Sequence, residues 1–218
     1  MTRSGQHGFF ITFEGPEGAG KSTQCARLAA DLESAGRNVL LARDPGGCPL
    51  SEELRRLLKH FGTAEDVCPE AELLMFGASR AQLTRQVILP HLAAGGVVVC
   101  DRFADSTTVY QGVARGLHAE FIEAMHAFTV PRWPNLTLLL DLDVATTFRR
   151  TGQRAAQINE EADRIEAEDR TFHEAVRNGF LALARSAPER IRLVDAAQPV
   201  ETVYAAVREE VFHALDHA

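Results

Sequence analysis

Short, almost continuously apolar runs alternate along this sequence with longer segments of helical periodicity. Runs of this length without polar alternation are typical of strands that a sheet buries on both faces. Because a helical segment separates each run from the next, the pattern predicts an α/β fold, a five-stranded parallel sheet flanked by helices with right-handed connections. The predicted strands are residues 8–14, 38–43, 96–101, 135–143 and 190–196.

Apolar positions three or four residues apart mark the first helix. Cys25, Leu28, Ala29 and Leu32 share one face, and Gly36 is typical of the helix end that follows. Ser51 is the predicted N-cap of the second helix.

The same periodicity predicts the remaining helices. They cover residues 69–93, begin again near 106, and then cover 118–130, 163–185 and 200–215. Residues 151–164 are the most polar stretch of the chain and the best candidate for a mobile flap. We therefore expect a single domain over residues 1–218 with a lid at about 150–164.

One stretch carries a phosphate-binding motif. Residues 15–22 read Gly-Pro-Glu-Gly-Ala-Gly-Lys-Ser and fit G-x-x-x-x-G-K-[ST] between a predicted strand and a helix. Gly15 and Gly20 permit backbone conformations that a Cβ forbids, so the N–H groups of the loop converge on phosphate oxygens. Lys21 would neutralise the β- and γ-phosphates, and Ser22 would offer its hydroxyl to Mg²⁺. The motif predicts a nucleoside triphosphate site and leaves the reaction open.

A second candidate lies at the end of the strand over residues 96–101. In a P-loop fold, a carboxylate at such a strand end orders the magnesium shell, so Ser22 and Asp101 are the predicted Mg²⁺ ligands. Arg102 would point a cation into the same crevice. The alternative is an ordinary salt bridge at a strand end.

Composition and charge limit the partners. A chain of 218 residues with a net charge of −7 argues against a nucleic-acid partner, which would require a basic surplus. There is no apolar run of membrane-spanning length, and the start of the chain lacks a secretory signal, so we expect a cytoplasmic protein with no membrane partner. The widely spaced Cys25, Cys48, Cys68 and Cys100 contain no CxxC pair and are expected to be reduced.

Three classes of P-loop protein were compared. A GTPase requires an N-K-x-D element, but Lys59, the only lysine outside the motif, lies in L-L-K-H. An ATPase motor usually has a hydrolytic glutamate after the strand-end aspartate, and Arg102 stands there instead. A small-molecule kinase needs arginines that clamp an anionic acceptor and a flap that excludes water. Arg43, Arg80 and Arg102, together with the arginines of the flap, favour the kinase.

Several motifs in order resemble those of the thymidylate kinase family, and the resemblance runs nearly end to end. They are FEGPEGAGKST (13–23), RDPGGCPLSEELRRLL (43–58), AELLMFGASRAQL (71–83), DRFADSTTVYQG (101–112), EADRIEAEDRTFHEAVRNGF (161–180) and VDAAQPVETV (194–203). The resemblance implies a three-layer P-loop nucleoside monophosphate kinase fold with a mobile lid. It also implies Mg²⁺-dependent phosphorylation of dTMP to dTDP by ATP, for dTTP synthesis, in a homodimer.

The resemblance implies two sets of binding residues. The ATP-binding set is Gly15, Pro16, Glu17, Gly18, Ala19, Gly20, Lys21, Ser22 and Thr23. The dTMP-binding set is Glu17, Arg43, Pro45, Phe76, Arg80, Arg102, Ser106, Tyr110 and Gln111.

At the base, Phe76 would stack on the thymine ring and Arg80 would hydrogen-bond its carbonyl edge. Four residues separate them, so on a helix they share a face. Tyr110 would crowd the 2′ position of the sugar, while Gln111 and Ser106 would bond the base and nearby backbone.

At the sugar and phosphate, Glu17 would bond the 3′-hydroxyl, and Arg43 and Arg102 would bind the 5′-phosphate. Lys21, Arg102, Glu17 and Arg154 form the expected catalytic set.

The loop has no arginine beside Glu17, as in the bacterial form of the family, in which the lid supplies the missing cation. The expected lid arginine is replaced by Asn159, so Arg154 is the candidate, with Arg149 and Arg150 as alternatives. Asp44 and Val109 are milder departures from the family pattern. Two other functions stay open at this point. They are a kinase for another deoxynucleoside monophosphate, and a nucleotide-binding regulatory protein without turnover.

Overall fold

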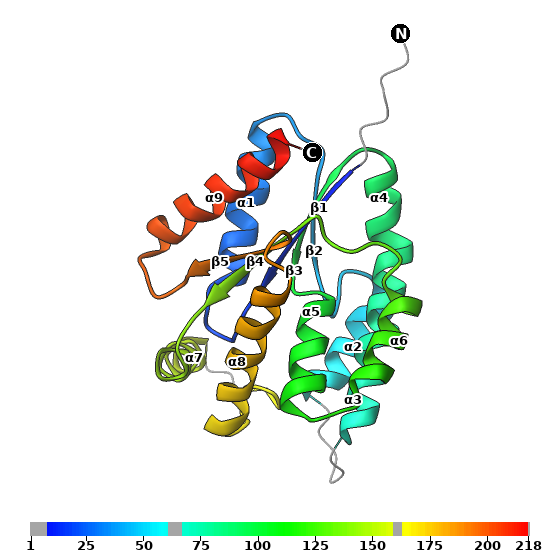
Figure 1. The fold of residues 1–218 in the computed structure, drawn as a ribbon, viewed down its shortest axis with the longest axis vertical. Helices are drawn as coiled ribbons and strands as arrows, with labels where there is room; N and C mark the ends of the chain where they lie inside the picture. Colours follow the sequence, from blue (N-terminus) through cyan, green and yellow to red (C-terminus); the bar gives the residue numbers. More distant parts are fainter. Residues whose placement is uncertain (1–7, 61–66, 159–162, 218) are drawn as a thin grey trace.

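The computed structural model describes residues 8–60, 67–158 and 163–217. Its strands form one parallel sheet in the order β2-β3-β1-β4-β5 (Figure 1). The strands are β1 Phe9–Glu14, β2 Val39–Arg43, β3 Val97–Asp101, β4 Leu136–Asp141 and β5 Ile191–Asp195. The predicted five-stranded sheet is confirmed, and each strand ends within two residues of its predicted bounds.

Helices cover both faces of the sheet. They are α1 Lys21–Ser34, α2 Pro49–His60, α3 Pro69–Leu83, η1 Thr84–Ile88, α4 Leu89–Ala93, α5 Ala104–Thr107, η2 Thr108–Ala114, α6 Ala119–Thr129, α7 Val144–Ile158, α8 Arg170–Ser186 and α9 Val200–Asp216. Figure 1 shows α1 and α9 on one side of the sheet and α4, α5 and α8 on the other. No helix within the described ranges is long and apolar enough to cross a membrane.

Strand β1 explains why a near-continuous apolar run was needed. Phe9, Ile11 and Phe13 are buried against α1 and α9, whereas Phe10 is buried against η1 and α4 on the opposite face. Successive side chains on a strand point to opposite faces, so a sheet covered on both sides requires apolar residues at every position.

The predicted helix over residues 69–93 is confirmed as a continuous helical segment with a π-helical turn inside it. The π-helical turn, η1, immediately precedes α4, whose second residue is Pro90. Proline has no N–H to donate and clashes with the carbonyl four residues earlier, so widening of the preceding turn accommodates it.

Two predicted helix starts are wrong. Helix α2 begins at Pro49, so Ser51 lies inside its first turn and donates its hydroxyl to the carbonyl of Ser79 instead of capping the helix. Helix α8 begins at Arg170, where the Asp169 carboxylate accepts from the Phe172 N–H at 2.8 Å. Residues 163–169 form turns, because the Asp163 carboxylate binds the N–H groups of Ile165 and Glu166 and so prevents regular helix formation there.

The predicted flap is largely helical. Helix α7 extends to Ile158, so it contains most of the segment 150–164 that the sequence analysis assigned to the lid. Asn159 lies outside the described residues.

Leu138 offers a test of how the sheet is stabilised, because it lies in β4 with none of its surface exposed. Leu138→Ala should lower the free energy of unfolding by about 2–5 kcal/mol, since it removes apolar contact and leaves a cavity. Leu193→Ala on β5 is the matched control, because Leu193 is 56% exposed, and its effect should stay within about 0.5 kcal/mol. Urea unfolding measures both, and equal losses would contradict the assignment of the core.

Candidate active site

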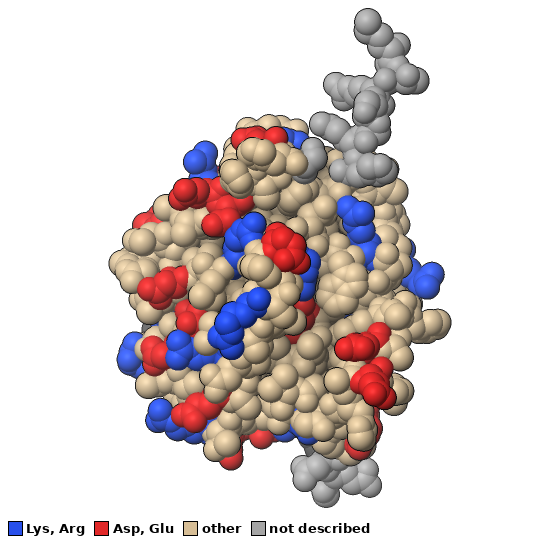
Figure 2. All heavy atoms as spheres, in the orientation of Figure 1, with Lys and Arg blue, Asp and Glu red and all other residues tan. Residues whose placement is uncertain are grey.

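A cleft of about 910 Å³ lies at the carboxyl edge of the sheet. The ends of β1, β2 and β3 and the segments that follow them supply lining residues, among them Glu17, Lys21, Arg43, Pro45 and Arg102. Parallel α/β sheets bind ligands at this edge, because the loops that follow several strands meet there. On the face of the molecule in Figure 2, acidic and basic side chains are interspersed.

The glycine-rich loop has the backbone geometry that its motif predicts. Gly15, Gly18 and Gly20 have φ angles of 131°, 72° and 89°. A Cβ at Gly15 would lie 2.3 Å from the carbonyl oxygen of Leu140, so a side chain there would clash with backbone. The prediction that Gly15 and Gly20 require glycine conformations is confirmed.

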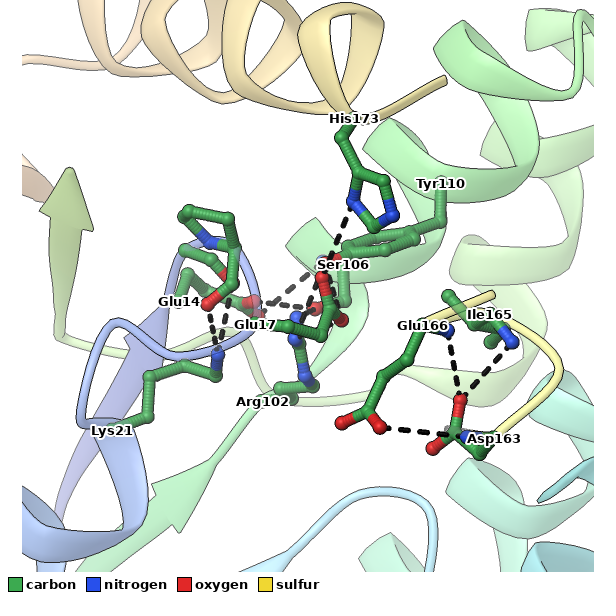
Figure 3. A network of polar contacts seen from close by, with 12 residues as sticks. Glu14, Glu17, Lys21, Arg102, Ser106, Tyr110, Asp163, Ile165, Glu166 and His173 are labelled. Carbon is green, nitrogen blue, oxygen red and sulfur yellow. Dashed lines mark hydrogen bonds and ion pairs between the residues drawn. The ribbon is translucent and has the colours of Figure 1, made fainter. Parts of the chain in front are cut away.

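Lys21 lies at the start of α1 and points back into the loop (Figure 3). Its Nζ donates to the carbonyl oxygens of Gly15 at 3.0 Å and Pro16 at 2.7 Å. Burial, followed by the nearby positive charge of Arg102, lowers the pKa of the Lys21 ammonium to about 8. The lysine is therefore buried at the loop, where it donates to two carbonyl oxygens, and the carboxylates of Asp101, Glu17 and Glu14 offset only part of the effect of burial on its pKa.

Ser22 and Asp101 meet at the mouth of the loop. The Ser22 hydroxyl donates to Oδ2 of Asp101 at 2.5 Å. Both groups present oxygen atoms, the ligands that Mg²⁺ prefers, and Mg²⁺ usually takes few protein ligands and keeps waters and phosphates in the rest of its shell. The predicted pair therefore fits this ion. Within the described residues there is no group of three or more His, Cys, Asp and Glu that would hold a metal.

Glu17, which is part of the loop, forms one connected group with Arg102 and Tyr110 (Figure 3). Arg102 donates to the Glu17 carboxylate at 2.7 Å, and the Tyr110 hydroxyl donates to both of its oxygens at 2.8 and 2.9 Å. Burial alone would raise the pKa of the Glu17 carboxyl, but Arg102, Lys21 and Tyr110 together hold it below its ordinary value. Glu17 is therefore kept as an anion.

Arg102 reaches this position through an unusual backbone conformation. Its φ is 67°, and its N–H donates to the carbonyl of Phe13 at 2.9 Å. Left-handed φ values are uncommon for residues with a Cβ and often mark functional sites. The conformation turns the chain at the end of β3, so the guanidinium lies between Glu17 and Ser106.

Glu14 is a buried acid that the sequence analysis did not select. Its carboxylate accepts from the Phe103 N–H at 2.7 Å and from the Ser106 hydroxyl at 2.5 Å. Burial, with the negative charge of Asp105, raises the pKa of Glu14 to about 7. Ser106 is thus bonded to Glu14 and Arg102 in this structure. The available signal was a carboxylate at the end of an otherwise apolar strand.

His173 on α8 was also missed. It is 2% exposed, and its Nδ1 lies 3.9 Å from a Glu17 oxygen (Figure 3). Its ring packs edge-on against Phe148 and Phe172. No motif or spacing in the sequence separates it from an ordinary core histidine.

Phe76, Arg80 and Gln111 also line the cleft. Arg80 is 1% exposed; its Nε donates to Asp44 at 2.6 Å and its Nη2 to Thr107 at 2.7 Å. Its Nη1 has no hydrogen-bond partner among the described residues. Phe76 and Arg80 thus line one cleft, as their spacing indicated.

Near the second strand end, Arg43 and Pro45 line the cleft together with a residue that the sequence analysis overlooked, Arg55. The Arg55 guanidinium donates to the carbonyl of Pro45 at 2.9 Å, while Arg43 pairs with Glu52 at 2.8 Å. Arg55 is adjacent to Arg56 in an amphipathic helix, so only the helix orientation distinguishes the one that faces the cleft.

The three lid arginines differ in position. Arg150 and Arg154 line the cleft, whereas Arg149 donates to Thr146 on its own helix. Arg150 donates to the carbonyl of Gly18 at 3.3 Å and so contacts the phosphate loop, and Arg154 pairs with Glu166.

A family model and individual relatives of this chain all indicate the same protein family. The family model for thymidylate kinase matches residues 13–207. A thymidylate kinase of Geobacter sulfurreducens is 45% identical over 205 residues, covering 93% of this chain and 95% of that protein. One from Pseudomonas putida strain W619 is 48% identical over 199 residues, covering 91% and 93%.

A solved structure agrees with these relatives. The crystal structure of thymidylate kinase from Ehrlichia chaffeensis superposes with a TM-score of 0.75 at 31% identity, covering 94% of this chain and 98% of that chain. The sheet, the phosphate loop and the match along most of the sequence lead to one conclusion. The chain belongs to the thymidylate kinase family, and it is a phosphotransferase.

Proposed function

We propose that the protein transfers the γ-phosphoryl group of ATP to dTMP, with Mg²⁺, and releases dTDP and ADP. One observation carries this proposal: Lys21 of the phosphate loop lines the same cleft as Glu17, Arg102 and Tyr110, a connected group that would bind the phosphate-accepting nucleotide. Family membership supports dTMP as the acceptor.

At the donor end, the N–H groups of residues 15–23 would bind the phosphates of ATP, and Lys21 would exchange its carbonyl partners for phosphate oxygens. Ser22 and Asp101 would hold Mg²⁺, which supplies positive charge to the β- and γ-phosphates. The short Ser22–Asp101 contact supports this, since both oxygens already lie on one side of the loop.

At the acceptor end, the 5′-phosphate would lie among the arginines that line the cleft near Pro45, namely Arg43, Arg55 and Arg102. Glu17, held as an anion, would accept a hydrogen bond from the 3′-hydroxyl of the sugar. Phe76 would stack on the base. Nη1 of Arg80, which has no partner within residues 8–60, 67–158 and 163–217, would donate to a base carbonyl. Tyr110 would crowd the 2′ position of the sugar. Ser106 would support this arrangement, because it is bonded to Arg102, which in turn donates to the Tyr110 hydroxyl.

The chemistry needs no covalent enzyme intermediate. An oxygen of the dTMP phosphate attacks the γ-phosphorus in line, and the bond from that phosphorus to the β–γ bridging oxygen breaks. Positioning and charge neutralisation carry such a transfer. Lys21, Arg102 and the lid arginine are the cations that this chain would place around the transferred group.

We also propose that the protein is a cytoplasmic homodimer. Its four cysteines are free thiols, in keeping with a reducing compartment. Helices α3 and α6 pack together and expose large apolar side chains, Leu74, Phe121 and Phe128, that a second copy of the chain would cover.

The substrate assignment is tested by steady-state kinetics with dTMP, dUMP, dCMP, dAMP, dGMP and UMP as acceptors. We expect the highest kcat/KM for dTMP. UMP should give a much lower value than dUMP, because the two share a base and differ only by the 2′-hydroxyl. A higher kcat/KM for any purine nucleotide or ribonucleotide would contradict the proposal. Single-turnover assays separate an enzyme from a binding protein, since bound ATP and dTMP without dTDP would exclude catalysis.

Arg154 is the proposed lid cation. Arg154→Ala should lower kcat by about tenfold to a thousandfold while changing the Kd for dTMP little, because the charge it neutralises develops only in the transition state. Arg149→Ala is the matched control on the same helix, and it should retain kcat because Arg149 contacts Thr146. An unchanged kcat in Arg154→Ala would move the role to Arg150.

The pKa of Lys21 predicts an alkaline limb for ATP capture. Its ammonium is charged below the pKa of about 8 and neutral above it, so kcat/KM for ATP should fall as pH rises through 8. Bound phosphates stabilise the ammonium, and the limb in kcat should therefore lie at higher pH. Lys21→Arg is the control, because a guanidinium stays charged and its slower reaction should show no limb in this range. A flat wild-type profile between pH 7 and 9.5 would contradict the assignment.

A further inference from the structure

Glu72 is a buried carboxylate just outside the cleft. It lies on α3, is 1% exposed, and precedes Phe76 by one helical turn. Its Oε1 accepts from Nε2 of Gln111 at 2.7 Å, and its two oxygens face the guanidinium groups of Arg115 and Arg164. None of the roles proposed above uses it.

The contact with Glu72 determines which end of the Gln111 amide is available to a ligand. A carboxylate paired with two arginines is an anion, and an anion only accepts hydrogen bonds. Gln111 must therefore turn its NH₂ group toward Glu72. Because Gln111 is a lining residue of the cleft, its Oε1 is the atom left for a base, and it is an acceptor.

Arg80 supplies the complementary group. Thr107, which binds Nη2 of Arg80, lies four residues before Gln111 on the same helical segment. Nη1 of Arg80, which has no hydrogen-bond partner in the described part of the chain, is a donor. A donor beside an acceptor matches a base edge that carries a carbonyl beside an N–H, as thymine does at O4 and N3. Cytosine presents the opposite polarity, an amino group beside an unprotonated nitrogen.

We propose that Glu72 is a positioning residue for base selection: it fixes the Gln111 amide so that the cleft accepts thymine and rejects cytosine. This rests on the proposed function, in which dTMP is the acceptor. A purely structural role, in which Glu72 only anchors Arg115 and Arg164, would leave base selection untouched.

Glu72→Gln tests the proposal because the orientation of the new amide at position 72 can be predicted from its neighbours. The two arginines require acceptors, so the new amide turns its oxygen toward them and its NH₂ toward residue 111. Gln111 then accepts with its oxygen and turns its own NH₂ into the cleft, where it suits the unprotonated N3 of cytosine. The side chains are nearly isosteric, and folding is checked by circular dichroism and thermal unfolding.

The readout is the ratio of kcat/KM for dTMP to that for 5-methyl-dCMP, two nucleotides that differ only at positions 3 and 4 of the base. We expect Glu72→Gln to lower this ratio by about tenfold or more, because a mismatched buried hydrogen-bonding group is costly. The values for dTMP and dUMP should fall in parallel, since both carry the same N–H and carbonyl.

Two further variants separate positioning from structure. Arg115→Gln removes one cation from Glu72 but leaves the bond to Gln111, so the ratio should stay within about twofold of wild type. Gln111→Leu should lower the ratio by itself, and adding Glu72→Gln to it should lower the ratio no further, because Glu72 acts through Gln111.

Each of these measurements either supports the role of Glu72 in base selection or overturns it. A ratio that is unchanged in Glu72→Gln, or that falls further in the double variant than in Gln111→Leu, overturns the inference. A neutron crystal structure of the wild-type protein with dTMP gives a test that needs no variant, because it distinguishes an amide NH₂ group from an amide oxygen. Gln111 Nε2 must remain on Glu72 with Oε1 at N3 of the base, and a reversed amide overturns the inference. A wild-type protein that does not phosphorylate dTMP would instead overturn the proposed function.

Discussion

The ion pair between Glu17 and Arg102 joins the two halves of this active site. Glu17 belongs to the phosphate loop after β1, and Arg102 to the turn after β3, so the pair couples the loop to the edge where the acceptor would lie. Both side chains are mostly buried, and removing one partner of such a pair generally costs about 3–5 kcal/mol, because the other charge is left uncompensated. The left-handed backbone of Arg102 helps to place its guanidinium in this pair, and the Tyr110 hydroxyl is hydrogen-bonded to both partners.

Other charged side chains, Glu14 and Lys21, lie close to this pair. The site therefore contains both acidic and basic groups, although the net charge of the whole chain is −7. Glu14, which interacts electrostatically with Arg102, has its pKa raised to about 7, chiefly by burial. The pKa of Lys21 is lowered to about 8, also chiefly by burial. Both groups sit where burial disfavours their charged forms. A bound phosphate would favour the ammonium of Lys21, whereas for Glu14 it would favour the neutral acid.

The sequence predicted the sheet well because its signal is local. Strands buried on both faces need apolar residues throughout, and the sequence of β1 alone shows this. The two wrong helix starts arise from competition that the sequence does not display. Ser51 has a side chain that can cap a helix, but its hydroxyl donates to the carbonyl of Ser79, which is distant in sequence. Residues 163–169 had helical composition, but the Asp163 carboxylate binds their N–H groups in a turn.

A motif or a helical spacing indicated residues that the structure brings to one cleft, as in the phosphate loop and for Phe76 and Arg80. Glu14, Arg55, Glu72 and His173 were missed because their partners are brought to them by the fold. Glu14 is bonded to Ser106, which is 92 positions away, and Glu72 to Gln111, which is 39 positions away. A carboxylate on an apolar strand or helix gives no indication by itself of which donor it will meet.

The two ends of the cleft would gain binding energy in different ways. Lys21 already donates to two loop carbonyls, so a phosphate would exchange neutral acceptors for a charged one, and the gain is only the difference between them. Nη1 of Arg80 is buried and has no hydrogen-bond partner among the residues that the structure describes, so a base carbonyl would satisfy a donor whose desolvation has already taken place on folding. A correctly placed base carbonyl should therefore gain more binding free energy at Arg80 than a phosphate gains at Lys21, and a wrong atom at Arg80 should lose more. This difference explains why selectivity would reside in the buried residues of α3 and η2, whereas the phosphate loop would serve any nucleotide that carries the same phosphates.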